Sequence, residues 1–180
     1  MPAKNPTPPD DGELIPDEPL HDHIDQLGLS QVRFAHLAGV NDRTVRRWLS
    51  GELETPACVH RLAIFALELQ EADPIRCAEL IEVFTGRGDD DGGTEQPTPP
   101  RADPMTGKAF AYELENLGLS QSEFAQLTLT NPHTVRRWAD QEQYIPSWVG
   151  RFMRLVDAVQ SARHGLFTEL LRELRITPTE

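Results

Sequence analysis

Residues 27–62 of this chain occur again, in modified form, at 117–152, and no other sequence feature constrains the fold as strongly. An ungapped comparison of the two segments gives 18 identities in 36 positions. Both segments contain Leu-Gly-Leu-Ser-Gln near their start and Thr-Val-Arg-Arg-Trp further on. A repeat of this length indicates one folded unit used twice. The 180-residue chain is therefore expected to hold two small units of roughly 65–70 residues, each with a limited core.

Shifts in composition mark the boundaries of the two units. Residues 1–19 are acidic and rich in proline, with few apolar side chains, so we expect a disordered tail. Residues 86–104 begin with glycines and aspartates and end rich in proline, which is typical of a flexible linker. We expect the first unit at 20–85, the second at 105–175 and a short tail at 176–180.

The apolar spacing predicts an all-α fold with five short helices in each unit. In the first unit, for example, Leu20, Ile24 and Leu27 lie on one helical face, and Gly28 ends that helix. Helix starts are indicated by capping residues and prolines. They are Ser30, Asn41, Thr55 with Pro56, and Pro74 in the first unit, and Ser120 with Glu123, Asn131 with Pro132, and Pro146 in the second.

The second and third helices of each unit are joined by a tight turn, near Gly39 in the first unit. This is helix-turn-helix geometry, in which the later helix enters the major groove of DNA. The third helix of the first unit places Val45, Trp48 and Leu49 on one face and arginines on the other. We interpret Trp48 and its repeat, Trp138, as core anchors. Trp148, which follows in the fourth helix of the second unit, is expected to pack on a fifth helix or at an interface.

The outward face of the third helix carries the candidate chemistry. Its arginines are Arg43, Arg46 and Arg47. Arginine can donate two hydrogen bonds to guanine O6 and N7. The Arg-Arg doublet recurs at 136–137, which favours a binding role over a solvated basic face.

These motifs resemble the lambda-repressor-like (Cro/C1, or XRE-type) helix-turn-helix family. The resemblance rests on Gly-Leu-Ser-Gln, Phe-Ala-x-Leu-Ala-Gly-Val and Thr-Val-Arg-Arg-Trp-Leu-Ser-Gly with a following proline. It covers most of 20–70 and, less closely, 110–160. Within the family the chain is similar to short phage and prophage regulators, including anti-CRISPR-associated repressors. The resemblance implies a protein of the bacterial cytoplasm or nucleoid.

The resemblance also implies which side chains meet DNA. In the first unit they are Gln31, Asn41, Asp42, Arg43, Thr44, Arg46 and Arg47, and in the second Gln121, Asn131, His133, Thr134, Arg136 and Arg137. Backbone amides at the start of the fourth helix would meet phosphate. Arg61 and Arg151 are expected either to help there or to be surface charges or partners of internal pairs.

The two copies are not equal. The net charge is +3 over residues 27–51 and zero over 117–141. The second copy also replaces Ala-Gly-Val in the turn with Thr-Leu-Thr, and it has Gln141 where a glycine follows the third helix in the first copy. We therefore expect the first unit to dominate DNA affinity, with the second reading a weaker half-site, contacting backbone or binding protein.

Composition excludes several other classes of protein. The net charge of −12 argues against indiscriminate nucleic-acid binding. No apolar run approaches a membrane span, and no signal core is present at the N-terminus. Cys58 and Cys77 are expected to be small core residues. We see no pattern of metal ligands, nucleophile or phosphate loop, so no metal, cofactor or enzymatic activity is expected.

The sequence thus predicts a transcriptional regulator that binds a double-stranded DNA operator, as a repressor that blocks promoter access. The alternative is a helix-turn-helix protein-interaction module, antitoxin-like or a polymerase adaptor, whose second repeat contacts a protein partner. One chain would cover two half-sites, or two chains would form a homodimer through the fourth or fifth helix. The apolar residues of 165–174 lead us to prefer the homodimer.

Overall fold

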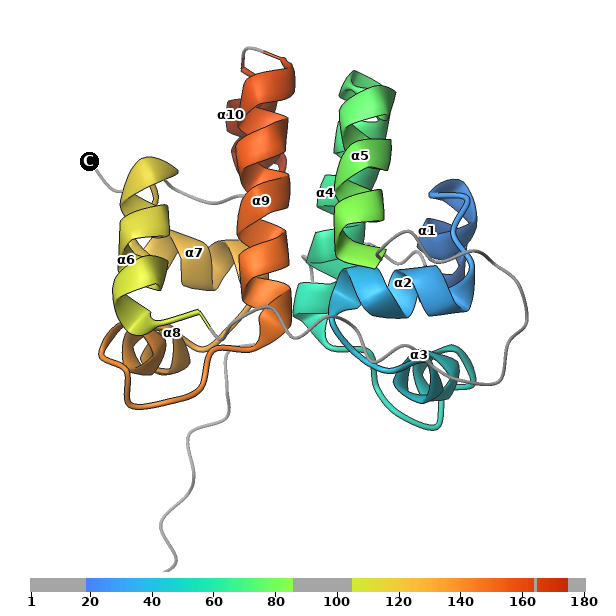
Figure 1. Ribbon diagram of the computed structural model, residues 1–180, viewed down its shortest axis with the longest axis horizontal. Coiled ribbons are helices and arrows are strands. Elements are labelled where there is room, and N and C mark those ends of the chain that lie inside the picture. Colours follow the sequence, from blue (N-terminus) through green and yellow to red (C-terminus); the bar gives the residue numbers. More distant parts are fainter. Residues whose placement is uncertain (1–18, 86–104, 164, 175–180) are drawn as a thin grey trace, which may run out of the picture.

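A computed structural model describes residues 19–85, 105–163 and 165–174, and within these ranges the protein is all-helical (Figure 1). The first unit holds α1 (Leu20–Gln26), α2 (Gln31–Ala38), α3 (Asp42–Leu49), α4 (Ala57–Ala72) and α5 (Pro74–Thr85). The second holds α6 (Gly107–Asn116), α7 (Gln121–Thr128), α8 (Pro132–Ala139), α9 (Ser147–Ala162) and α10 (Leu166–Glu173). The predicted linker at 86–104 lies outside the described residues, as do 1–18 and 176–180 of the predicted tails and residue 175 of the predicted second unit.

Most of the predicted helix starts are confirmed by local hydrogen bonds. The Ser30 hydroxyl accepts from the Arg33 backbone amide at 3.3 Å, and the Asn41 carboxamide accepts from the Thr44 amide at 2.8 Å. Ser120 and Glu123 form the predicted capping box at the start of α7. These contacts join residues three positions apart, which explains why they can be predicted from the sequence.

The predicted start of α4 is wrong by one residue. Pro56 is the N-cap rather than the first helical residue, and Thr55 makes no cap. Pro56 has an extended backbone, with ψ at 138°, so the helix begins only at Ala57. The helix runs to Ala72, and after Asp73 the next helix, α5, begins at Pro74.

The second copy keeps the backbone of the first at both turns where it lacks a glycine. Gly39 ends α2 in the left-handed region with φ at 69°, and Leu129 ends α7 in the same region with φ at 52°. Gln141, with φ at 60°, takes the place of Gly51, whose φ is 72°. A left-handed conformation costs a non-glycine residue roughly 1–2 kcal/mol. The scaffold of the repeat therefore requires these turns even where the residue type disfavours them.

The two units pack directly on one another through α4 and α9, which lie side by side at the centre of the molecule (Figure 1). Phe65 of α4 lies 5.1 Å from Phe152 of α9 and 6.4 Å from Phe167 of α10, measured between ring centroids. All the buried apolar side chains of both units belong to one hydrophobic cluster. Helix α10 contributes Leu166, Leu170 and Leu171 to it, so the apolar face on which the predicted homodimer rested is occupied within the chain.

A second contact between the units is made where α2 meets α9. A Cβ atom on Gly39 would lie 2.6 Å from the Ser147 Oγ and 3.2 Å from the Trp148 backbone nitrogen. The Ser147 hydroxyl donates to the Gly39 carbonyl at 3.3 Å. The carbonyl end of α2 thus faces the amide end of α9, a favourable arrangement of the two helix dipoles. Gly39 therefore serves both the turn and the close approach of the two units.

Candidate nucleic-acid interface

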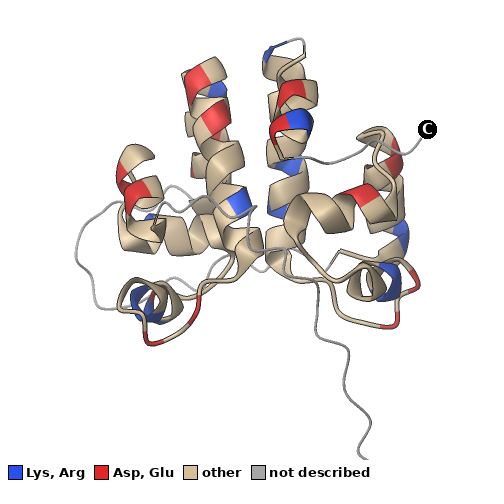
Figure 2. Cartoon of the chain, turned by 180° about the vertical axis from the view of Figure 1, so that it is seen from behind, with Lys and Arg blue, Asp and Glu red and all other residues tan. Residues whose placement is uncertain are grey.

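Helices α3 and α8 lie on the same side of the molecule, one in each unit (Figures 1 and 2). Both lie at the bottom of the view in Figure 1, whereas α5 and α9 extend toward the top, and the view from behind shows the same arrangement. Each follows its preceding helix after a short turn and packs against it, α3 on α2 and α8 on α7. The repeat thus presents two equivalent helices on one face.

The inner faces of α3 and α8 anchor them in the core, as predicted. Val45 and Val135 are fully buried, and Trp48 and Trp138 are almost so. Leu49, which we expected to be buried, is only partly buried. The short helices cannot tilt without exposing these side chains, so their outward faces are held in place.

Trp148 packs within the second unit rather than on a fifth helix. Its ring lies 6.0 Å from the Trp138 ring in an edge-on arrangement and 6.4 Å from Phe152. Trp138 in turn lies 6.0 Å from Phe110 of α6. This aromatic chain ties α8 to α9 and α6, and the first unit has Cys58 in place of Trp148.

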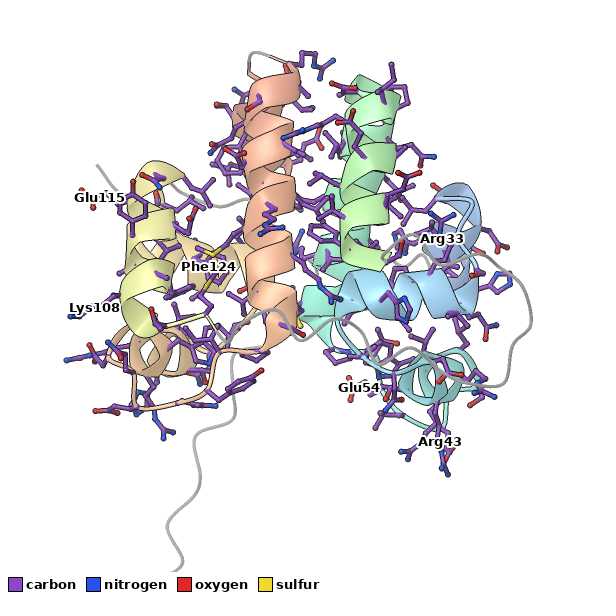
Figure 3. All side chains as sticks on the ribbon, viewed as in Figure 1. Arg33, Arg43, Glu54, Lys108, Glu115 and Phe124 are labelled. Carbon is purple, nitrogen blue, oxygen red and sulfur yellow. The ribbon has the colours of Figure 1, made fainter. Side chains whose placement is uncertain are left out.

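The outward faces carry the predicted arginines in exposed positions. Arg43 points away from the body of the molecule at the exposed end of α3 (Figure 3). The other exposed residues of the predicted set are Gln31, Asn41, Arg46 and Arg47 in the first unit, and Gln121, Asn131, His133, Arg136 and Arg137 in the second. Asp42, Thr44 and Thr134 are partly buried.

Some of the predicted polar residues are already engaged in holding the helices. The Asn41 side-chain oxygen accepts from both the backbone amide and the hydroxyl of Thr44, each at 2.8 Å. In the second unit the Asn131 oxygen accepts from the His133 amide at 2.8 Å. These oxygens therefore shape the N-termini of α3 and α8, while the amide nitrogens of both asparagines remain available as donors.

The four doublet arginines each face a carboxylate of the same unit. Arg47 lies 3.2 Å from Glu52, and its repeat, Arg137, lies 3.7 Å from Glu142. Arg46 pairs with Asp42 one turn earlier on α3, whereas Arg136 lies 3.6 Å from Asp140 one turn later on α8. Apart from Asp42, of whose side chain only 19% is exposed, the partners in these pairs are largely exposed, so the pairs contribute little to stability.

Glu52 and Glu142 are site residues that the sequence analysis missed. Both lie in the loop after the outward helix, just beyond residues 27–51 and 117–141. In the cartoon, acidic positions (red) of this loop lie near the basic positions (blue) of the helix in each unit (Figure 2). With Glu52 and Glu54 included, the carboxylates around α3 balance Arg43, Arg46 and Arg47. The advantage of +3 for the first unit is therefore smaller than the sequence count indicated. The signal was available, because the glutamate is identical in both copies.

Of the alternatives considered for Arg61 and Arg151, both phosphate binding and an exposed surface charge are wrong. Arg61 is 1% exposed and Arg151 is 9% exposed, because they lie on the faces of α4 and α9 that turn inward. Burial lowers the pKa of both guanidinium groups. The Arg151 guanidinium lies 6.0 Å from the centre of the Phe84 ring of α5, in the other unit. Both arginines are buried, and Arg151 contacts the first unit, so neither can reach a ligand on the outer face.

Other kinds of site find no support in the described part of the chain. No three residues of the types that bind metals come together within 19–85, 105–163 and 165–174. In the same ranges, no helix combines the length and the apolar character needed to cross a bilayer. The resemblance to lambda-repressor-like proteins rests on the motifs alone, because no family model, curated protein or solved structure matches the chain.

Proposed function

We propose that this protein binds double-stranded DNA sequence-specifically, through two helix-turn-helix units that insert α3 and α8 into the major groove, and that it regulates transcription by blocking a promoter. The observation that carries the proposal is the placement of both arginine-bearing helices on one face of the molecule (Figures 1 and 2). Two groove-reading helices on one side are what adjacent half-sites on one face of a duplex need.

The first unit is suited to direct readout of bases. Arg43 is exposed and makes no ion pair with any described residue, so its guanidinium is free to contact a guanine. The N-terminus of α4, in the same unit, supplies backbone amides for a phosphate. Arg46 and Arg47 would exchange their carboxylate partners for DNA on binding, and the small net worth of exposed ion pairs keeps that exchange inexpensive.

Selection of bound sequences from random duplex DNA, followed by gel shifts on the enriched sites, tests the proposal. We expect an enriched site and a tenfold or greater loss of affinity in the double variant Arg43→Ala, Arg47→Ala, at about 1–3 kcal/mol for each good base contact. The matched control is Arg76→Ala with Arg154→Ala, since these exposed arginines lie on α5 and α9. Unchanged specific binding in the first variant would refute the assignment of the reading residues.

A protein-interaction module is the second candidate, and the charge balance of the candidate face favours it. Every arginine of the two doublets is paired with a carboxylate, and the whole chain has a net charge of −12. A surface of this kind attracts phosphate less strongly than a basic one. A protein captured through the second unit, together with no DNA shift at 50 mM salt, would support this candidate over the first.

A further inference from the structure

We infer that a single chain occupies one non-palindromic DNA site in a fixed orientation, with α3 and α8 reading different half-sites. This inference rests on the proposed DNA-binding function and adds the stoichiometry and the symmetry of the site. It follows from two observations, the rigid pairing of the units and the difference between their outward helices.

The relative position of α3 and α8 is set by packed helices. Phe65 and Phe152 meet across the α4–α9 contact, and both are fully buried. The Gly39 turn, which leads into α3, rests directly on the first turn of α9 through Ser147. Because these contacts join the two units inside one chain, α3 and α8 keep one spacing and one relative orientation without a second chain.

The two helices differ at the positions nearest their N-termini. These are the residues of a recognition helix that reach base edges. Asp42 and Arg43 of α3 correspond to Pro132 and His133 of α8 in the repeat. Arg43 offers a two-pronged guanidinium with donors only, whereas His133 offers an imidazole with one donor and one acceptor when neutral. The two helices therefore recognise different bases at equivalent places.

The identical arginines are also directed differently in the two units. Arg46 is held by Asp42, toward the start of α3, and Asp42 is largely buried, with 19% of its side chain exposed. Arg136 faces Asp140, toward the end of α8. The guanidinium groups of these equivalent arginines therefore point toward opposite ends of their helices before DNA binds. A symmetric operator would present both helices with the same bases, which this pair of surfaces does not match.

The intact chain tests the inference in two measurements. Random duplex DNA is enriched on the protein, and the mass of the complex on the enriched site is measured by native mass spectrometry. We expect one chain per site and two unlike half-sites about one helical turn apart. Arg43→Ala should reduce discrimination in one half-site about tenfold, and His133→Ala should affect only the other.

A variant that copies α3 onto α8 gives a complementary result. Pro132→Asp, His133→Arg and Asp140→Ser together reproduce the outward side chains of the first unit. The enriched site of this variant should become more nearly palindromic, still with one chain bound. The wild-type measurements decide the inference by themselves if the variant folds poorly.

Outcomes that overturn this inference alone can be distinguished from one that overturns the proposed function as well. A palindromic wild-type site, or two chains on one site, would overturn this inference and leave the proposed function in place. Failure to enrich any DNA at 50 mM salt would overturn the proposed function and the inference together. Equal effects of Arg43→Ala on both half-sites would also refute the inference.

Discussion

The buried and the outward sides of the repeated unit differ in how closely the two copies agree. Val45 and Trp48 in α3 recur as Val135 and Trp138 in α8, and all four are buried. Among exposed neighbours, Arg43 is replaced by His133. The Arg-Arg doublet and its glutamate are exposed yet identical in both copies, which packing cannot explain. The comparison separates what the fold needs from what a binding surface needs.

The largest effect should come from breaking the buried side, where the two units share one core. Phe152→Ala removes a fully buried ring that contacts Phe65, Phe124 and Trp148. We expect a loss of about 4 kcal/mol in the free energy of unfolding, measured by urea denaturation. Hydrogen exchange should accelerate in α2 of the first unit as well as in α7 of the second, because one core supports both.

The control for this change is Tyr144→Ala, which truncates an aromatic ring that is 68% exposed. It should shift the free energy of unfolding by less than about 0.5 kcal/mol. Fast exchange confined to the second unit in the Phe152→Ala variant would show that the two units unfold independently, contrary to the rigid pairing described above.

The next largest effect on stability should come from exchanging the residues at the two equivalent turns, Gly39 in the first unit and Leu129 in the second. Gly39→Leu copies the residue of the second unit into the first, where a Cβ meets Ser147 and the Trp148 backbone. Left-handed strain and overpacking together should lower the free energy of unfolding by about 3 kcal/mol. The reverse change, Leu129→Gly, relieves strain but removes a leucine side chain that is 38% exposed, so it should change stability by less than about 1 kcal/mol. Urea midpoints of the two variants give the comparison, and equal losses would contradict it.

How much of this structure could be predicted from sequence depends on the range of the interactions involved. The caps at Ser30, Asn41 and Ser120 are formed with residues three positions away, and they were predicted correctly. The pairing of α4 with α9 joins residues far apart in the chain, and no local pattern specifies it. Arg61 and Arg151 were misplaced for that reason, since an arginine in an isolated helix is expected to face solvent.

The candidate site shows the same division. Periodicity alone placed the arginines of α3 outward, and the structure agrees. The partners of those arginines were not predicted, because the loop that returns Glu52 to Arg47 has no periodic pattern. We predicted from net charge that the first unit dominates DNA affinity. Because the nearby glutamates reduce that difference in charge, the prediction now rests on the change from Arg43 to His133.

A third prediction uses that change directly. Arg43→Ala should weaken binding to the enriched DNA site by about 1–3 kcal/mol, since it removes from the start of α3 a guanidinium that has no ion pair with any described residue. His133→Ala should cost less, because a neutral imidazole has a single donor. Titrations by fluorescence anisotropy at fixed salt measure both, and a larger loss for His133→Ala would reverse the ranking of the two units.

A fourth, smaller effect concerns pH and is confined to the first unit. Burial, with a smaller contribution from nearby His23, lowers the pKa of His60 below its ordinary value of 6.5. The two rings are 5.9 Å apart. The unfolded chain then binds the proton more readily, so stability present above pH 6.5 is lost as the pH falls through the lowered pKa.

Thermal unfolding between pH 7 and pH 5 measures this dependence. His60→Gln should flatten the fall in Tm, while His133→Gln provides a matched loss of one exposed histidine from the second unit. The repeat has Gly150 in place of His60, so no counterpart exists there. An unchanged slope in His60→Gln would assign the pH dependence to other groups.

The smallest expected effect tests the part of the outward surface that the two copies share. Glu52→Gln and Glu142→Gln each remove the carboxylate that faces the second arginine of a doublet. An exposed ion pair is worth about 0.2–1 kcal/mol, so the loss of each pair should strengthen DNA binding by roughly 1.4-fold to fivefold. The control is Glu54→Gln, which removes the same charge from the same exposed loop.

Glu54 has no ion pair with any described residue, so this variant isolates the general effect of charge. If Glu54→Gln matches Glu52→Gln in anisotropy titrations, Glu52 acts through net charge alone. If the two paired variants gain equally and the control does not, the retained glutamate restrains the arginine in both units, and the units differ only in the bases they read.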